Sequence, residues 1–326
     1  MTFVVVIPAF NEAATLEAVV TGARAHAPVI VVDDGSDDGS AAIAARAGAE
    51  VVRHQERRGK AAALRSGIAV ARAQGAAWVV TLDGDGQHAT TDLAQLLRAA
   101  RETPNQMIVG NRLADARQFP RGRLNAMQVA AFFVEWVSGL GVHDTQSGFR
   151  VYPMALLDDV PLARPGFVFE TEGLIAAARR GWRVREVQVT SIPSARRRSR
   201  FRPVRDGVAI GAYIAEHALR RGIQEARLGV RLLAARLASR RLRSAGEGRL
   251  RLRRAAVVVT AGLTTPVLLG ATVAQAMLGR LAPDWVTPLV QRLYSLDRLT
   301  SLTGPLEARP ADLSAVALAT SPPRRS

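Results

Sequence analysis

The chain has no cysteine among its 326 residues. Disulfides and thiolate metal sites are therefore excluded, and the absence is compatible with a reducing compartment. Lysine is almost as rare, because Lys60 is the only lysine among 44 basic residues. No secretory signal is apparent, since an apolar run already begins at residue 3. We therefore expect the first half of the chain to remain in the cytoplasm.

Acidic residues are scarce in the second half of the chain. Residues 179–326 hold 28 basic and 9 acidic residues, whereas residues 1–178 hold 16 and 19. This asymmetry predicts contact with an anionic surface, either a membrane or a nucleic acid. Within residues 195–254 the aromatic residues are Phe201 and Tyr213, so the stacking platform of a nucleic-acid-binding protein is missing. We therefore expect an anionic membrane surface as partner and no nucleic acid.

The glycine fingerprint of dinucleotide-binding folds is also missing, because Pro8-Ala9-Phe10-Asn11-Glu12 follows the first apolar run. This excludes the usual hydride-transfer site. Apolar runs predict strands at residues 3–7, 28–32, 50–53, 78–82 and 106–110. Helices are predicted at residues 13–25, 59–74, 123–139 and 170–181, with another ending at 47 that Ser36 or Asp37 would cap. The alternation predicts an α/β fold with a doubly wound, mostly parallel sheet.

Acidic side chains follow two of these strands. Asp33 and Asp34 end one strand, and Asp83 and Asp85 follow another. Ligands of doubly wound sheets bind at the carboxyl ends of strands, so we expect both pairs to face one site. Carboxylate oxygens suit Mg²⁺ or Mn²⁺, which would connect the protein to a diphosphate.

Each acidic motif also has a purely structural interpretation. The stretch 82–88 is compatible with a solvated Asp-Gly turn, and Asp33-Asp34-Gly35-Ser36 with a helix-capping turn. For His88 we favour a structural hydrogen bond over a role as an Mn²⁺ ligand. Glu170 and Glu172 would lie in a first helical turn, where the helix dipole alone favours acidic residues.

Several ordered motifs resemble those of family 2 glycosyltransferases, in particular the branch that includes dolichol-phosphate-mannose synthase. The resemblance covers roughly residues 3–205. It is carried by Val6-Ile7-Pro8-Ala9-Phe10-Asn11-Glu12, Val31-Val32-Asp33-Asp34-Gly35-Ser36, Arg58-Gly59-Lys60, Leu82-Asp83-Gly84-Asp85-Gly86-Gln87-His88, Gly110-Asn111-Arg112, Asp144-Thr145-Gln146-Ser147-Gly148-Phe149-Arg150 and Phe169-Glu170-Thr171-Glu172.

This resemblance implies the nucleotide-sugar-binding, glycosyltransferase A-type fold and a metal-assisted, inverting transfer of a hexose to a polyprenyl phosphate. It implies a donor site made of Pro8, Phe10, Glu12, Asp34, Lys60, Asp83, Gly84, Asp85 and Arg112. It also implies Asp83, Asp85 and Gln87 as ligands of Mg²⁺ or Mn²⁺, and Gln146, Ser147, Ser199 and Arg200 at the acceptor.

The catalytic candidates are Asp144, Asp85, Arg112 and Glu172. An acceptor hydroxyl would need a general base, for which Asp144 is the first candidate and Glu172 the second. A lipid phosphate is already an anion and needs positioning instead. Two departures from the family pattern stand out: Ala61 follows Lys60 where relatives often have glycine, and Arg200 follows Ser199 where many have lysine.

We expect four segments: a catalytic domain at 1–203, basic juxtamembrane helices at 204–254, an apolar helix at 255–281, and a C-terminal segment at 282–326 that ends in a disordered tail. The first basic helix would present Val204, Val208, Gly211, Ala215 and Leu219 on one face, either to the bilayer or to the domain. Residues 255–279 are uncharged and would span a membrane or lie at its interface as a hairpin. The arginines that precede them would place the enzyme at the cytoplasmic face of the membrane.

Other functions remain compatible with the sequence: transfer to another glycan or lipid hydroxyl, a basic nucleic-acid-binding protein, and a non-catalytic scaffold. Intact Asp83, Asp85 and Gln87 argue against the scaffold.

Overall fold

A computed structural model of the chain describes residues 2–113, 121–160, 162–192, 205–217, 219, 220, 223 and 227. Within them one sheet has the strand order β3-β2-β1-β4-β6-β5-β7. The strands are β1 (Phe3–Ala9), β2 (Val29–Asp33), β3 (Glu50–Arg53), β4 (Trp78–Thr81), β5 (Gln106–Asn111), β6 (Arg150–Pro153) and β7 (Arg183–Gln188). Strand β6 is antiparallel to β4 and β5, and the other pairs are parallel. The predicted doubly wound, mostly parallel sheet is confirmed.

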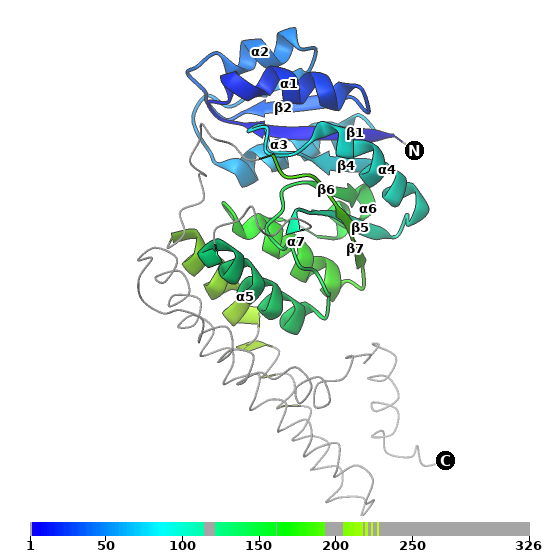
Figure 1. The fold of residues 1–326 in the computed structure, drawn as a ribbon, viewed down its shortest axis with the longest axis vertical. Coiled ribbons are helices and arrows are strands. Elements are labelled where there is room, and N and C mark those ends of the chain that lie inside the picture. Colours follow the sequence, from blue (N-terminus) through cyan, green and yellow to red (C-terminus); the bar gives the residue numbers. More distant parts are fainter. Residues whose placement is uncertain are drawn as a thin grey trace, which may run out of the picture.

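Helices cover both faces of the sheet (Figure 1). They are α1 (Ala13–Arg24), α2 (Ser40–Arg46), α3 (Lys60–Ala73), α4 (Leu93–Glu102), α5 (Arg121–Ser138), α6 (Met154–Asp159) and α7 (Val168–Arg179), with the short 3-10 helix η1 (Thr90–Asp92) before α4. Helices α1, α2 and α4 pack on one apolar cluster, and α3, α5, α6 and α7 on the other.

Strand β1 shows why two layers form. Its side chains alternate between the faces, as a strand requires. Val4 and Val6 join the cluster with α3, whereas Val5 and Ile7 join the cluster with α1. All four are at most 5% exposed. A central strand that is apolar on both faces needs helices on both sides, which is what the connections between parallel strands supply.

The strand directions determine which residues meet at one edge of the sheet. Strands β1, β2, β4 and β5 run in parallel and end at the same edge, whereas β6 runs the opposite way and begins there. Residues 144–149, which precede β6, therefore lie beside residues 82–87, which follow β4. Arg150 pairs with Thr81 across β4 and β6.

The predicted cap of α2 is wrong. Neither Ser36 nor Asp37 caps α2, because Gly39 precedes the helix with φ 84° and contributes no side-chain bond. Ser36 Oγ instead accepts a hydrogen bond from Asn11 N at 2.9 Å. The sequence also left β6, α6 and β7 unpredicted, because these segments are short and mix polar with apolar residues. Helix α4 was not predicted either, although its buried Leu93, Leu96 and Leu97 recur at helical spacing.

One face of the helix at residues 205–217 packs on the domain. Ile210, Tyr213 and Ile214 are at most 7% exposed and join the cluster that contains α7. The predicted apolar face was wrong at Val208, which is 52% exposed. The reason is that the larger side chains of Ile210 and Ile214 bury more apolar surface than a face centred on Val208 would.

None of the helices in the described part of the chain is both long enough and apolar enough to cross a bilayer. The apolar segment predicted at 255–281 and the tail lie outside the described residues.

Candidate active site

The nucleoside candidate Asp34 is fully engaged with its own protein. Its carboxylate accepts hydrogen bonds from Arg58 N at 2.8 Å, Gly59 N at 2.7 Å and His54 Nδ1 at 2.7 Å. The side chain is almost completely buried. Asp34 therefore holds the turn from which α3 starts, with Gly59 at φ 94°. This brings Lys60, the first residue of α3, to the site.

The neighbouring candidates lie where β1 joins α1. Pro8 is in β1 and partly buried, and Phe10 follows the strand. The Arg57 guanidinium lies 4.3 Å from the centroid of the Phe10 ring, a cation–π arrangement. Glu12 is 6% exposed, and its backbone N–H donates to Ser40 Oγ at 2.8 Å. Phe10 and Asp34 thus come from adjacent strands, paired as Ala9 with Asp33.

The acidic motif after β4 forms a turn with limited freedom. Thr15 Oγ1 donates to the Gly84 carbonyl at 2.7 Å, and Gln87 N donates to Asp85 Oδ1 at 3.0 Å. Burial raises the pKa of Asp85, and the nearby Asp83 carboxylate raises it further. Two carboxylates that repel each other in this way are stabilised by a bound cation.

Lys60 is the counter-charge of this motif in the structure. Its Nζ lies 2.7 Å from Asp83 Oδ1 and 2.9 Å from Glu170 Oε1. Burial opposes the charge of Lys60, yet Asp83 and Glu170 together hold its pKa above the ordinary lysine value. Burial would likewise raise the pKa of Asp83, but Lys60 above all lowers it. Both groups are therefore charged at neutral pH.

The donor set of the acidic motif is compatible with a hard divalent cation. Asp83 and Asp85 offer carboxylate oxygens, and Gln87 adds an amide oxygen. The described residues contain no cluster of three or more His, Cys, Asp or Glu side chains that could hold a metal. Two carboxylates and an amide leave coordination positions that a diphosphate could fill, as in many Mg²⁺ sites.

Gly148 lies against this cluster, and a side chain there would disturb it. A Cβ at Gly148 would be 2.6 Å from Asp83 Oδ2 and 2.9 Å from Lys60 Nζ. We expect G148A to lower transferase activity at least about tenfold, because small displacements of catalytic groups are costly. Steady-state kinetics would measure this. The matched control is G141A, where the nearest atom to a Cβ is Glu135 Oε1 at 3.9 Å, and retained activity in G148A would contradict the crowding argument.

Arg112 and Asp144 form a buried, bidentate ion pair. Arg112 Nε donates to Asp144 Oδ2 at 2.7 Å and Nη2 to Oδ1 at 2.8 Å, and the Arg112 backbone N–H adds a third bond at 3.1 Å. Asp144 is fully buried and Arg112 is 9% exposed. Although burial opposes ionisation, Arg112 holds the pKa of Asp144 below its usual range. Asp144 is thus engaged as a positioning group, in a geometry that does not suit the general-base role considered for it.

Glu186 of β7 fixes the turn that carries Asp144. Its Oε1 accepts hydrogen bonds from His143 N at 2.9 Å and Asp144 N at 3.0 Å. One oxygen of the second base candidate, Glu172 Oε2, accepts a hydrogen bond from Arg164 N at 2.8 Å. The sequence pattern does not reveal these contacts of Glu186 and Glu172. In each case the backbone N–H that the carboxylate binds belongs to another segment of the chain.

The acceptor candidates before β6 are held by Arg150, which is completely buried. Its guanidinium donates to three carbonyls, those of Ser147 at 2.7 Å, Thr145 at 2.8 Å and Glu170 at 2.7 Å. Gln146 Nε2 donates to Thr171 Oγ1 at 2.8 Å, and Ser147 is fully buried. Arg150 therefore ties the turn 144–149 to the first turn of α7. In the sequence Arg150 is distinguished only as the last residue of the motif at 144–150.

The remaining acceptor candidates, Ser199 and Arg200, lie outside the described residues. The chain approaches that segment beside the acidic motif, because Ile192 N donates to the Gln87 carbonyl at 2.8 Å. Ser191 likewise pairs with His88 in an isolated bridge.

His88 is packed rather than exposed. It is 3% exposed, its ring centroid lies 5.2 Å from that of Phe149, and its Nδ1 has no hydrogen-bond partner within the described residues. Burial, with Arg112 adding to it, lowers the pKa of His88 to about 4. His88 is therefore neutral at pH 7.

This pKa predicts a pH dependence of stability. An unfolded histidine has a pKa of about 6.5, so below that value the unfolded chain binds the proton first. We expect His88 to cost up to about 3 kcal/mol of stability as the pH falls from about 6.5 to 4. Urea unfolding of the wild type and of H88L at several pH values would measure the difference. A difference that does not change with pH would contradict the prediction.

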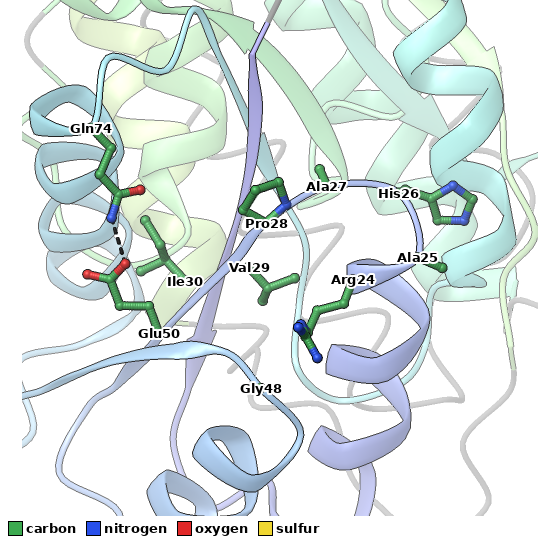
Figure 2. A pocket seen from close by; sticks show the side chains of 10 residues that line it. All are labelled: Arg24, Ala25, His26, Ala27, Pro28, Val29, Ile30, Gly48, Glu50 and Gln74. Carbon is green, nitrogen blue, oxygen red and sulfur yellow. Dashed lines mark hydrogen bonds between the residues drawn. The ribbon is translucent and has the colours of Figure 1, made fainter.

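One hollow in the described surface lies at the other edge of the sheet (Figure 2). Its volume is about 480 Å³, and it is lined where β2 begins by Pro28, Val29 and Ile30 and from neighbouring elements by Arg24, Glu50 and Gln74. Gln74 Nε2 donates to Glu50 Oε2 at 2.6 Å across one side of it. Because β2 ends at the opposite edge, this hollow is separate from the acidic motif.

The fold and the charged edge define the class of protein: an α/β glycosyltransferase with the A-type fold. Residues 4–160 match the family model described as Glycosyl transferase family 2. The chain is 33% identical over 208 residues to the Glycosyltransferase AglJ of Haloferax volcanii, which covers 62% of this chain and 67% of that protein. It is 31% identical over 201 residues to the polyprenol monophosphomannose synthase of Mycolicibacterium smegmatis, which covers 57% of this chain and 76% of that protein.

A solved structure supports the fold assignment. It is the glucosyl-3-phosphoglycerate synthase from Mycobacterium tuberculosis in complex with phosphoglyceric acid, with a TM-score of 0.52 and 25% identity. The match covers 66% of this chain and 79% of that one. The chain belongs to glycosyl transferase family 2, and it is a glycosyltransferase.

Proposed function

We propose that this enzyme transfers a hexose from a nucleotide-diphosphate sugar to a polyprenyl phosphate with inversion at the transferred carbon. The observation that carries the proposal is the state of the acidic groups near the site. Asp144 is paired with Arg112, and Glu172 accepts a backbone N–H. Both oxygens of Asp144, the first base candidate, are therefore engaged by Arg112, whereas a phosphate acceptor needs no base.

The cationic groups support the same acceptor. Lys60 and Arg112 lie on the edge where β4 and β5 end, and both are charged. An arginine held by a carboxylate still supplies a delocalised positive charge, and a lysine ammonium serves as a point charge. An anionic acceptor and an anionic leaving group both require such counter-charges. The polyprenol named for the Mycolicibacterium smegmatis relative is compatible with this choice.

In the proposed reaction an oxygen of the acceptor phosphate attacks the anomeric carbon of the sugar. The bond between that carbon and the diphosphate breaks, and the electron pair leaves with the nucleoside diphosphate. Asp83, Asp85 and Gln87 would hold Mg²⁺ or Mn²⁺, which when bound neutralises charge on the diphosphate. Arg112 stabilises negative charge near the transferred group, and Asp144 keeps its guanidinium oriented. Phe10 and Glu12 would border the nucleoside, and Asp34 would position the turn at Arg58 and Gly59 beside it.

We further propose that the enzyme works on the cytoplasmic face of the membrane. Residues 179–326 hold 28 basic but only 9 acidic residues, and this positive charge supports attraction to anionic lipids. Val208 adds an exposed apolar side chain on the helix at 205–217. Flotation of the full-length chain with vesicles, either neutral or containing anionic lipid, tests the attraction to anionic lipid. Equal binding to both kinds of vesicle would contradict the electrostatic part.

The proposal is tested by offering membranes and a panel of labelled nucleotide sugars, with and without Mn²⁺ or Mg²⁺. We expect label in an acid-labile lipid only when a divalent ion is present. Label in an acid-stable glycan or lipid would favour a hydroxyl acceptor instead. Label in a soluble phosphorylated acid would favour an acceptor like the phosphoglyceric acid of the mycobacterial structure. Salt-sensitive DNA binding without any transfer would favour the nucleic-acid alternative.

A further inference from the structure

Lys60 contacts two carboxylates that differ in their surroundings. Asp83 belongs to the acidic motif after β4, whereas Glu170 lies in the first turn of α7. The Glu170 side chain is 2% exposed, and the Asp83 side chain is 26% exposed. Lys60 therefore contacts the buried Glu170 in the protein interior and the more exposed Asp83 in the acidic motif.

Glu170 depends on Lys60 for its charge compensation. Within the described residues, Glu170 Oε2 is buried and accepts no hydrogen bond. The neighbouring Arg150 guanidinium donates to the Glu170 backbone carbonyl, not to its carboxylate. A buried carboxylate that loses its cation is strongly destabilised. Lys60 therefore has a physical reason to stay with Glu170 even when its contact with Asp83 is broken.

Asp83 has two potential cationic partners. Its Oδ1 is bound by Lys60 Nζ at 2.7 Å, and Asp83 is also a predicted ligand of the divalent cation. An ammonium and a divalent ion compete for the same carboxylate, because each cation repels the other and so weakens its electrostatic attraction to the carboxylate. A cation that binds Asp83 therefore weakens the contact between Asp83 and Lys60.

We propose that Glu170 is a positioning residue that retains Lys60 at the site when a divalent cation takes over Asp83. The inference rests on the proposed function, because the freed ammonium then faces the diphosphate that the cation binds. Glu170 thus links cation binding and diphosphate binding: the cation releases Lys60 from Asp83, and Glu170 prevents its withdrawal. No other charged group is needed for this exchange.

The test uses the full-length chain and two donor-independent probes, Mn²⁺ alone and Mn²⁺ with inorganic pyrophosphate. Free Mn²⁺ is measured by electron paramagnetic resonance, and stability by urea unfolding. The variants are E170Q and the double variant K60M/E170M, which removes both buried charges together and so avoids an unpaired one. The control is E102Q, since Glu102 forms an exposed ion pair with Arg185 at 3.0 Å away from the site.

The two variants are expected to change Mn²⁺ binding in opposite directions. K60M/E170M should bind Mn²⁺ alone about fivefold more tightly than the wild type, because no ammonium competes for Asp83. E170Q should bind Mn²⁺ about fivefold more weakly, because displaced Lys60 has no second carboxylate. In both variants pyrophosphate should add less to Mn²⁺ binding than in the wild type.

Other outcomes would overturn the inference. If E170Q changes only stability and leaves both probes within twofold of the wild type, Glu170 has a structural role alone. If K60M/E170M binds Mn²⁺ no more tightly, Lys60 does not compete with the cation. A wild-type chain that transfers sugar without binding Mn²⁺ or Mg²⁺ would refute the exchange while sparing the transferase. If all variants bind Mn²⁺ as expected but the wild-type chain transfers no sugar, the proposed function is wrong instead.

Discussion

Replacement of Asp85 by alanine is expected to reduce sugar transfer by about a thousandfold or more, since catalysis here depends on charge stabilisation by a bound cation. Asp85 lies in the turn after β4, where Gln87 N donates to its carboxylate. Burial and the Asp83 carboxylate raise its pKa, so the pair is electrostatically costly without a cation. Removing one of two carboxylate ligands should therefore remove most of the metal affinity while relieving this repulsion.

The measurement is the initial rate of transfer at saturating donor and metal, alongside urea unfolding. We expect the stability of D85A to equal or exceed that of the wild type, because a repulsive contact is lost. D85N tests the same charge with nearly the same shape. The control is D158N, which affects an exposed ion pair with Arg72. Full activity in D85A would refute the assignment of the acidic motif to the cation and the diphosphate.

Replacement of Asp144 by asparagine is expected to cost about 3 to 5 kcal/mol of stability, because it leaves the Arg112 guanidinium buried without its counter-charge. The pair is joined by side-chain hydrogen bonds of 2.7 and 2.8 Å, and Asp144 is fully buried. Activity should be lost as well, since Arg112 would no longer be oriented at the site. Urea unfolding and transfer assays at a temperature where the variant is folded measure the two effects separately.

A double variant separates stability from catalysis at this pair. R112M/D144L removes both charges and should recover most of the stability that D144N loses, since apolar replacements of buried ion pairs are often tolerated. Its activity should stay absent, because no guanidinium is left to meet the phosphate. If R112M/D144L were active, the ion pair would serve only the fold. If D144N were as stable as the wild type, the pair would contribute little to folding.

The sequence predicted well those features that depend on neighbouring residues. The start of α3 at Lys60 follows from Gly59 and the apolar positions behind it, and the helix forms there. Ala61, which departs from the family pattern, lies within α3 and is 1% exposed, so this position needs no glycine turn. The cap of α2 was predicted wrongly because Ser36 can also accept a bond from Asn11, which comes from a different loop.

The segment before β6 shows where local patterns stop being informative. Its polar and glycine-rich composition indicated a site, but not how it reaches the acidic motif. That depends on β6 running antiparallel between β4 and β5, which brings its first residue to the edge where the other two strands end. Helices α5, α6 and α7 pack together on one face of the sheet, which is a long-range arrangement that no local pattern reveals.

By itself, the amino-acid sequence determined the layered α/β architecture and placed Asp34 and Asp83 after the strands they follow, because apolar periodicity and glycine positions act over a few residues. Only the tertiary structure decided the partners of the charged groups: Asp144 for Arg112, and both Asp83 and Glu170 for Lys60. Lys60 and Glu170 are 110 residues apart in the sequence. Their contact follows from the strand order and from the energetic need to pair every buried charge.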